Sequence, residues 1–548
     1  MTNPLVDMEK AHVLFTIGTN MTECHPVAAA HLKRALARGA VLVNADPRRT
    51  RLAELAHLHL PLRVGSDAAL LLAMAHVLAR DGLVDEDFIA EHTTGYEEFR
   101  EHVSRFPPEW ASPICGVLSA DIEMAARLYG GADRAAIYYT LGITEHVGGV
   151  DNVLCLSNLA LMTGNLGREG TGINPLRGQN NVQGAGDAGA APNCYPGFQP
   201  VSDPAARRRF EAAYGREIDE AKGPTKIAAM ERCGDTVRAM LIDGENTVLS
   251  DADGTRCRRA LERLDHLVVA DIFLTETARL AHVVLPAAAW AESDGTFTNT
   301  ERRVQRVRAA VSAPGQARPD WWIVCQLARR LGFPGFDFEH PREIFGELCS
   351  LSPIYRGLSW ERAATGSFHW PVPDAQHPGT PRLHEGGFSI GRGVFKPVHY
   401  RDPAESLSPE YPIWLTTGRR LATYHTGTQT RRAAGFDYLD PGERLEVHPQ
   451  DAARSGLVDG GWCRMTSPRG AVDVRVECTE RSPRGTVFAS FSFAETPINV
   501  LTGGGYDPHT DTPEFKVCPV RLEPAQPDQH KACLQELIYR TDTVSDRG

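Results

Sequence analysis

The stretch HVLFTIGTNMTECHPVAAAHLKRALARGAVLVNAD, residues 12–46, decides the fold class. An apolar run ends at Ile17, the polar turn Gly18-Thr19-Asn20 follows, a helical pattern covers 26–38, and a second apolar run ends before Asp46. A proline opens the helical pattern and a glycine follows its last residue, which are the positions these residues favour at helix ends. This order predicts a β-α-β unit whose parallel strands point their carboxyl ends into one ligand-binding crevice.

The plan recurs later in the chain. An apolar run at 237–242 precedes Gly244-Glu245-Asn246, a helical pattern lies near 258–264, and a further run at 267–273 precedes Thr275. Beyond residue 406, short apolar runs alternate with Pro/Gly turns, which is typical of a small barrel. We therefore expect an α/β protein with two Rossmann-like α/β domains related by rough pseudo-symmetry, plus a C-terminal β barrel. The expected boundaries are 1–172, 173–405 and 406–548.

Composition excludes several protein classes. The 548 residues are 42% hydrophobic and 23% charged, which is globular rather than disordered. The net charge of -11 argues against a general nucleic-acid binder. The sequence has neither a long apolar run nor a signal peptide at its start, so we expect no membrane span. The 12 cysteines are scattered without any C-x-x-C, which favours reduced thiols in the cytoplasm over a zinc or iron-sulfur site.

The strand ends of the first unit carry a candidate nucleotide site. Backbone amides and helix N-termini suit phosphate, and a carboxylate suits sugar hydroxyls or guanine N–H groups. The alternative is an ordinary βα turn, and the absence of G-x-G-x-x-G disfavours a plain NAD site. The candidate residues are Gly18, Asn20, Glu23, Asp46 and Arg48, with Gly65 and Asp67 for the base or ribose.

A glycine-rich segment, residues 164–189, is predicted to be a loop that approaches a ligand closely. Within it, Arg177 lies in NPLRGQNNVQ, residues 174–183, where amide side chains and glycine surround the guanidinium. Such a donor-rich loop suits a small anion, although an exposed or ion-paired arginine fits the pattern equally well.

Four other features of the sequence are explained without a functional role. The isolated histidines His146 and His425 are more often structural than proton carriers. The pairs Arg302-Arg303 and Arg431-Arg432 are expected to be solvated surface residues.

Several segments together resemble a known family. GINPLRGQNNVQGA at 172–185, with YPGF after it, resembles the signature of molybdenum- or tungsten-dependent formate dehydrogenase catalytic subunits. These belong to the pterin-guanine-dinucleotide oxidoreductases, the dimethyl sulfoxide reductase family. The resemblance runs along essentially the whole chain. Further similar segments are ADPR at 45–48, MTGNLG at 162–167, DIFLTET at 271–277, residues 295–305, LTTGR at 415–419 and PEFKVC at 513–518.

The resemblance implies a molybdenum or tungsten atom held by two molybdopterin guanine dinucleotides, with the barrel covering the cofactor tails. Arg177 would hold formate, and the reaction would oxidise formate to CO2. The implied residues for one dinucleotide are Gly18, Asn20, Asp46, Arg48, Gly65 and Asp67, with Gly142, Glu145 and Gln179 also in the cofactor site. Those implied near the other are Gly244, Glu245, Asn246, Asp271, Thr275 and Asp294. From the barrel, the implied residues are Thr417, Gly418, Arg419, His425, Asn499 and Lys516.

The chain also departs from the family. The family has an upstream segment with the cysteines of an iron-sulfur cluster and the cysteine or selenocysteine that ligates the metal; residues 1–11 resemble the stretch just after it. We therefore expect no metal ligand in this chain, and an iron-sulfur cluster only in that upstream segment. A selenocysteine codon read as a stop would have separated the segment from this chain. The isolated chain would then lack turnover. Glu145 replaces a usual glutamine, and Gly186 and Ala188 replace a usual cysteine and methionine.

Electrons would leave to a partner subunit or carrier, either NAD-linked or ferredoxin-like. Two alternatives stay open at the level of sequence. One is another molybdopterin oxidoreductase, such as a nitrate reductase, which the Arg177 loop disfavours. The other is a non-catalytic cofactor-binding or scaffold subunit that keeps the fold without the metal.

Overall fold

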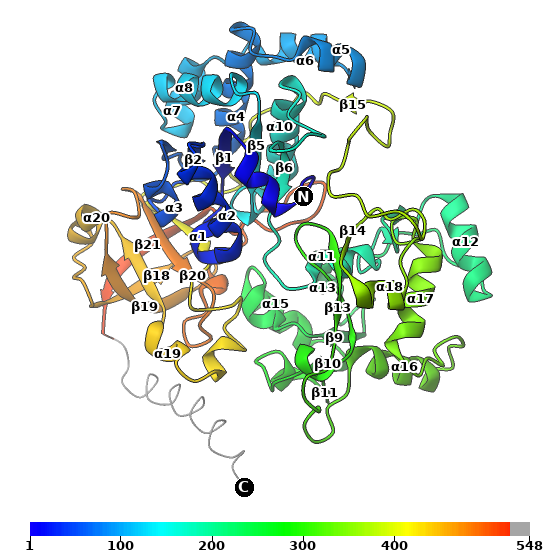
Figure 1. The fold of residues 1–548 in the computed structure, drawn as a ribbon. Helices are drawn as coiled ribbons and strands as arrows, with labels where there is room; N and C mark the ends of the chain where they lie inside the picture. The colour runs from blue at the N-terminus through cyan, green and yellow to red at the C-terminus, as the bar shows by residue number, and fades with distance from the viewer. Residues whose placement is uncertain (527–548) are drawn as a thin grey trace. The chain divides into compact units, whose positions relative to one another are not determined.

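The computed structural model describes residues 1–526, which form two compact units (Figure 1). The barrel unit comprises residues 6–174, 246–257 and 384–526. The hairpin unit comprises residues 1–5, 175–245 and 258–383. The chain thus passes between the units several times.

A five-stranded sheet is the centre of the first α/β domain in the barrel unit. Its order is β3-β2-β1-β5-β6, and β1 pairs in parallel with both β2 and β5. Every residue of β1 and β5 is buried, as expected for strands covered on both faces. The strands are β1 (Val13–Ile17), β2 (Val41–Ala45), β3 (Leu58–Leu60), β5 (Ala135–Tyr139) and β6 (Gly172–Pro175).

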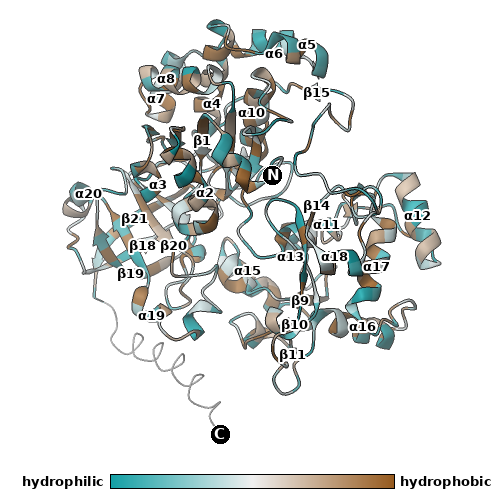
Figure 2. Ribbon diagram, viewed as in Figure 1, coloured by the Kyte–Doolittle hydropathy of each residue, from teal (hydrophilic) through white to brown (hydrophobic). Residues whose placement is uncertain are grey.

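Helices cover this sheet. Most residues of α4 (Asp67–Arg80) are buried, and α4 packs against α7, α8 and α10 in one core (Figure 2). A helix with apolar residues on nearly all sides is expected in such a central position. The other helices are α1 (Met21–Cys24), α2 (Pro26–Ala37), α3 (Arg51–Glu54), α5 (Glu86–His92), α6 (Tyr96–Val103), α7 (Pro108–Cys115), α8 (Ser119–Gly130), α9 (Leu141–Thr144) and α10 (Gly149–Met162).

The barrel unit also holds a closed six-stranded barrel, in the order β16-β20-β17-β19-β18-β21. Alternate residues of β19 point inward, and Val472, Val474 and Val476 belong to the barrel core. Closure leaves no exposed strand edge. The strands are β16 (Ile413–Gly418), β17 (Arg444–Val447), β18 (Trp462–Thr466), β19 (Ala471–Cys478), β20 (Thr486–Ser490) and β21 (Cys518–Ala525), with helices α19 (Phe436–Leu439) and α20 (Pro449–Arg454) between them.

The hairpin unit contains a parallel sheet of order β11-β10-β9 and an antiparallel sheet of order β12-β13-β14. Helices α16, α17 and α18 lie in the chain between β13 and β14. The strands are β9 (Ala239–Asp243), β10 (His266–Asp271), β11 (Val283–Pro286), β12 (Gly295–Thr298), β13 (Arg303–Val307) and β14 (Phe368–His369). The helices are α11 (Val182–Asp187), α12 (Pro204–Tyr214), α13 (Lys226–Glu231), α16 (Asp320–Arg330), α17 (Pro341–Leu351) and α18 (Trp360–Thr365). Helix α14 (Thr247–Ser250) belongs to the barrel unit, and α15 (Gly254–Glu262) spans the point in the sequence where the chain changes unit.

Equivalent hydrogen bonds recur in the two α/β domains. The Thr50 hydroxyl accepts from the Ala53 amide at 3.3 Å, and the Thr275 hydroxyl accepts from the Ala278 amide at 3.2 Å. Correspondingly, His57 Nδ1 accepts from the Leu42 amide at 3.0 Å and His282 Nδ1 from the Leu267 amide at 2.9 Å.

The Gly18 amide donates to Ala45 O and the Gly244 amide to Ala270 O. Both glycines have positive φ, 55° and 65°, a conformation that other residues adopt at a cost. These shared details confirm the predicted pseudo-symmetry of the two α/β domains.

Two expectations about local structure were wrong. The glycine-rich segment is not all loop, because it contains β6 and the short helix α11. Tertiary contacts override the low helix propensity of Gly184 and Gly186 there. The barrel strands β17 and β21 were not anticipated either. Among residues 1–526, no helix combines the length and the apolar character needed to cross a bilayer.

Candidate active site

The carboxyl end of β1 presents polar atoms that no described residue satisfies. Thr19 Oγ1 and Asn20 Nδ2 are buried, and neither has a hydrogen-bond partner within residues 1–526. Buried donors of this kind are costly unless a ligand or water completes them. Gly18 brings the backbone of β1 into the same turn with a positive φ. This set therefore fits an anionic group such as the phosphates of a dinucleotide.

Two buried carboxylates lie near these strand ends. Burial raises the pKa of Asp46 to about 6, although the Arg48 amide, 2.9 Å from Asp46 Oδ1, opposes the shift. Burial also raises the pKa of Asp67, which opens α4 after Gly65. Asp67, Glu23 and Arg48 all act electrostatically on Asp46, so the predicted residues are close neighbours. As carboxylates, both side chains can accept hydrogen bonds from sugar hydroxyl or base N–H donors.

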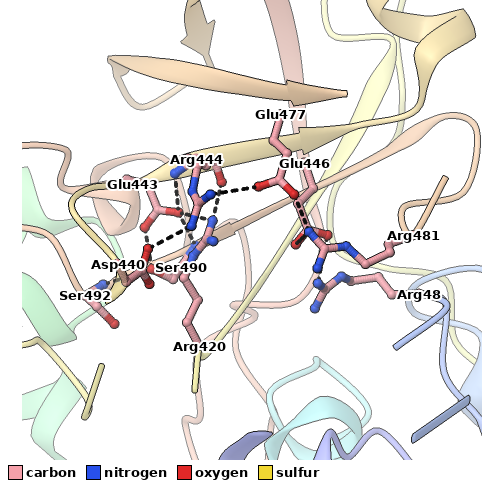
Figure 3. A network of polar contacts seen from close by, with 10 residues as sticks. All are labelled: Arg48, Arg420, Asp440, Glu443, Arg444, Glu446, Glu477, Arg481, Ser490 and Ser492. Atoms are coloured by element: carbon pink, nitrogen blue, oxygen red, sulfur yellow. Dashed lines mark hydrogen bonds and ion pairs between the residues drawn. The ribbon is translucent and has the colours of Figure 1, made fainter. Parts of the chain in front are cut away.

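Arg48 connects the first α/β domain to the barrel. Its Nη2 donates to Glu446 Oε2 at 2.8 Å, and its guanidinium lies 3.4 Å from the centre of the Phe488 ring. Arg481 also reaches Glu446, at 3.1 Å (Figure 3). Arg48 Nε is buried and has no hydrogen-bond partner among the described residues. Arg48 thus contacts the barrel through Nη2, while its buried Nε–H has no acceptor among the described residues.

A buried ion pair joins the end of α9 to the barrel. Lys516 Nζ lies 2.7 Å from Glu145 Oε2 and donates to Thr417 O at 3.1 Å. The Thr417 hydroxyl in turn donates to Phe515 O at 2.9 Å. Glu145, which stands where the resemblance leads us to expect glutamine, therefore has a cationic partner in Lys516.

Glycines allow the chain segments of this site to approach closely. A Cβ on Gly142 would lie 2.4 Å from Gly18 O, and one on Gly18 would lie 2.5 Å from Ile143 Cγ2. A Cβ on Gly418 would lie 2.6 Å from the Phe488 ring, and one on Gly65 would lie 2.7 Å from Pro403. These four glycines are explained by packing within the protein.

His146 lies between two carboxylates. Its Nε2 donates to Gly142 O at 2.8 Å, and Glu514 Oε1 and Asp67 Oδ2 lie 3.8 Å and 3.9 Å from its ring nitrogens. Burial alone would lower the pKa of His146, but Glu514 and Asp67 outweigh burial and raise it. Glu514 also accepts from the Ala404 amide at 3.1 Å. His146 therefore serves, as expected, as a structural residue, here linking α9, α4 and the barrel.

We expect His146→Gln to destabilise the protein more at pH 6 than at pH 8. The folded pKa of His146 lies above the unfolded value of about 6.5. Its charge therefore stabilises the fold fully below that value, and the contribution is lost as pH rises through the folded pKa. The measurement is the difference in thermal midpoint between variant and wild type at the two pH values.

His102 is the matched control, because burial lowers its pKa. Its Nε2 lies 2.7 Å from Val398 O, and Arg105 lies 2.8 Å from Nδ1. A lowered histidine pKa makes the folded state lose stability as pH falls, so His102→Gln should be less damaging at pH 6 than at pH 8. Equal effects of His146→Gln at both pH values would contradict the role of its charge.

Three other barrel residues that the sequence assigned to the cofactor site, Asn499, His425 and Arg419, make different kinds of contact. Asn499 Nδ2 donates to Leu249 O at 2.9 Å and to Ser250 O at 3.0 Å, which ties the barrel to α14. His425 has a φ of 53°, and its carbonyl accepts from the Ser492 hydroxyl at 2.7 Å. Arg419 is close enough to Cys24 to oppose the effect of burial, which raises the pKa of that thiol to about 11.

In the hairpin unit, Gly244, Glu245 and Asp271 lie at or just after the ends of β9 and β10, whereas Asp294 lies just before β12. Asp271 Oδ1 accepts from the Ile272 amide at 2.7 Å, and Asp294 lies 3.7 Å from Arg306. Glu245 pairs with Lys226. Asn246, which follows in the chain, is buried at the start of α14 in the barrel unit.

Arg177 is exposed and is held at two points within the hairpin unit. Its backbone amide donates to the Thr300 hydroxyl at 2.9 Å, and its side-chain Nε donates to Gln183 Oε1 at 3.1 Å. Gln179 precedes α11, and its carbonyl accepts from the Val182 amide at 3.5 Å. A guanidinium fixed at Nε suits the orientation of a small anion.

Arg302 corrects an expectation. It is 1% exposed rather than solvated. Within residues 1–526, its guanidinium donates only to backbone carbonyls, which gives it a structural role. The acceptors are Met1 O at 2.7 Å, Thr2 O at 3.2 Å, Thr380 O at 3.1 Å, Pro381 O at 2.7 Å and Trp370 O.

Arg431 is also less exposed than expected, with an ion pair to Glu495 at 2.5 Å. The contacts of Gln183 with Arg177 and with Asp187 were not predicted, although the spacing of one helical turn between Gln183 and Asp187 was visible in the sequence.

Comparisons with known proteins agree with this organisation. Residues 1–330 match the molybdopterin oxidoreductase family, and residues 413–519 match the molydopterin dinucleotide binding domain. The F420-dependent formate dehydrogenase subunit alpha of Methanocaldococcus jannaschii is 44% identical over 95% of this chain and 78% of its own length. Formate dehydrogenase H of Escherichia coli is 36% identical over 96% of this chain and 74% of its own length.

Among solved structures, acetylene hydratase from Pelobacter acetylenicus has the same fold, with a TM-score of 0.75 at 20% identity, covering 95% of this chain and 81% of that chain. The fold, the unsatisfied donors at the strand ends and these matches lead to one conclusion: the chain belongs to the molybdopterin oxidoreductase family.

Proposed function

We propose that the chain is the alpha subunit of a formate dehydrogenase, which oxidises formate to CO2. The observation that carries the proposal is Arg177, held at Nε by Gln183 inside the NPLRGQNNVQ loop. The relatives named as formate dehydrogenases support it, because they match along 95% or more of the chain.

Arg177 supplies a fixed positive charge for the substrate. Formate is an anion at neutral pH, whereas CO2 is neutral, so a guanidinium attracts the substrate and does not retain the product. The oxidation converts HCOO⁻ into CO2, one proton and two electrons. A molybdenum or tungsten atom bound by two pterin guanine dinucleotides would supply the electron-accepting chemistry, and Arg177 would orient formate for it.

The strand-end residues would hold the dinucleotides. Thr19 and Asn20 offer the unsatisfied buried donors, and Asp46 and Asp67 offer carboxyl groups of raised pKa. The equivalent turn at Gly244 supports a second, related site, because the two turns share their hydrogen bonding. The assigned residues are Gly18, Asn20, Asp46, Arg48, Gly65, Asp67, Gly142, Glu145, Gln179, Gly244, Glu245, Asn246, Asp271, Thr275, Asp294, Thr417, Gly418, Arg419, His425, Asn499 and Lys516.

The electrons would pass to a partner subunit or carrier, which the naming of the relatives as alpha subunits supports. Scattered single cysteines support a reducing compartment such as the cytoplasm.

The test uses the complex purified from its native host with its cofactor. Formate-dependent reduction of a redox dye, with molybdenum or tungsten near one atom per chain, is the expected result. Nitrate reduction without formate oxidation would overturn the proposal in favour of a nitrate reductase. Absence of both metals from the purified complex would favour a scaffold subunit instead.

A further inference from the structure

Helix α11 carries two buried polar residues behind Arg177. Gln183 and Asp187 are four positions apart and therefore lie on one face of the helix. Gln183 is 5% exposed and Asp187 is fully buried. Two polar side chains buried this deeply require specific partners.

Their partners form a continuous chain of hydrogen bonds that begins at Arg177. Arg177 Nε donates to Gln183 Oε1 at 3.1 Å, and Gln183 Nε2 donates to Asp187 Oδ1 at 2.9 Å. Tyr355 donates its hydroxyl proton to Asp187 Oδ2 at 2.7 Å and lies 2.7 Å from Thr298 Oγ1. The chain thus runs from an exposed guanidinium to a buried threonine of β12.

The chemistry of the carboxylate fixes the direction of this chain. An ionised Asp187 only accepts hydrogen bonds, so the Gln183 amide must turn its NH2 group toward Asp187. The Gln183 carbonyl oxygen must then face the opposite way, toward Arg177 Nε. An amide facing the other way would place NH2 against a guanidinium N–H and repel it.

The same β12–β13 region also holds the backbone around Arg177. Thr300 accepts from the Arg177 amide at 2.9 Å, and the Thr298 amide donates to Asn181 Oδ1 at 2.9 Å. Thr298 ends β12 and Thr300 lies in the turn between β12 and β13, so the Arg177 loop is bound at two points by the segment that also contacts Tyr355. Backbone and side chain of Arg177 share one rigid support.

We propose that Gln183 is a positioning residue for the substrate anion, and that Asp187 and Tyr355 act by fixing the orientation of its amide. The proposal rests on the proposed function, because it takes formate as the anion that Arg177 holds. An Nε–H committed to Gln183 is withdrawn from the substrate and fixes the plane of the guanidinium, which a directional contact to a small carboxylate requires.

The first test replaces Gln183 by methionine, which keeps the length and removes the acceptor. In the cofactor-loaded complex, Gln183→Met should raise the formate KM about 10-fold, the factor that about 1.4 kcal/mol represents. The turnover number should change less than KM. Gln183→Glu should raise KM further, because a carboxylate beside Arg177 neutralises the charge that attracts formate.

Two further variants separate positioning from helix stability. Asp187→Ala should raise KM in the same direction as Gln183→Met, because the Gln183 amide then loses the acceptor that fixes its orientation. Val182→Ala on the same helix, at a side chain 41% exposed and outside the hydrogen-bonded chain, should leave KM unchanged. A Gln183→Met enzyme with wild-type KM would overturn the proposal, as would a Val182→Ala enzyme with the same rise.

A readout without catalysis keeps the proposal testable if an enzyme variant loses its cofactor. Phenylglyoxal modifies arginine, and peptide mass spectrometry reports the rate at Arg177. Gln183→Met should increase that rate relative to wild type and Val182→Ala, because the guanidinium loses the contact that restrains it at Nε. An unchanged rate would overturn the positioning role. If the wild-type complex does not oxidise formate while Gln183→Met still increases the modification rate of Arg177, the proposed function fails and the positioning contact stands.

Discussion

Arg177→Ala is expected to lower kcat/KM for formate by about 10- to 150-fold. A hydrogen bond to a charged group contributes about 1.5–3 kcal/mol, and each 1.4 kcal/mol corresponds to a factor of ten. KM should rise because the substrate loses its cationic partner, and kcat should fall because formate loses its orientation. Steady-state dye reduction by the purified complex, with the metal content of each preparation measured, provides the values.

Arg177→Lys distinguishes charge from geometry. Lysine keeps the positive charge but lacks the planar fork and the Nε–H that Gln183 accepts, so the loss should lie between wild type and Arg177→Ala. Arg342→Ala is the surface control in the same unit, because Arg342 is exposed and forms an ion pair with the equally exposed Glu361. Unchanged kinetics in Arg177→Ala, with full metal content, would refute the role of Arg177.

The first β-α-β unit was predictable because its signals are local. The strands and helix observed at β1, α2 and β2 begin and end within about one residue of the positions that the apolar runs, the opening proline and the closing glycine predicted. Strand periodicity and helix caps depend on neighbours in sequence. The same reasoning located the strand-end turns at Gly18 and Gly244, because parallel strands always present their carboxyl ends to one edge.

The supports of the site were not predictable, because their partners are distant in sequence. Arg48 and Glu446 are separated by 398 positions, and no local pattern links them. Arg302 seemed to be half of a surface pair, but its carbonyl acceptors come from the chain start and from residues 370–381. Composition alone also made α11 improbable, since glycine disfavours helix.

Glu446→Ala is expected to destabilise the barrel unit by about 3–5 kcal/mol. Glu446 is 2% exposed and holds Arg48 Nη2 at 2.8 Å and Arg481 Nη2 at 3.1 Å. Removing one partner of a buried ion pair leaves the other charge without compensation, which costs far more than the pair contributes. Because a chain of two units need not unfold in one step, native-state hydrogen exchange of the β17 amides is the measurement.

Asp473→Ala is the matched control within the same barrel. Asp473 pairs with Arg464 through two contacts of 2.8 Å, yet the Arg464 side chain is 57% exposed. An exposed pair contributes about 0–1 kcal/mol, so this variant should change exchange little. The double variant Arg48→Met/Glu446→Leu should recover much of the loss, because it removes both buried charges together. If Glu446→Ala costs no more than Asp473→Ala, the buried pair does not hold the barrel to the first α/β domain.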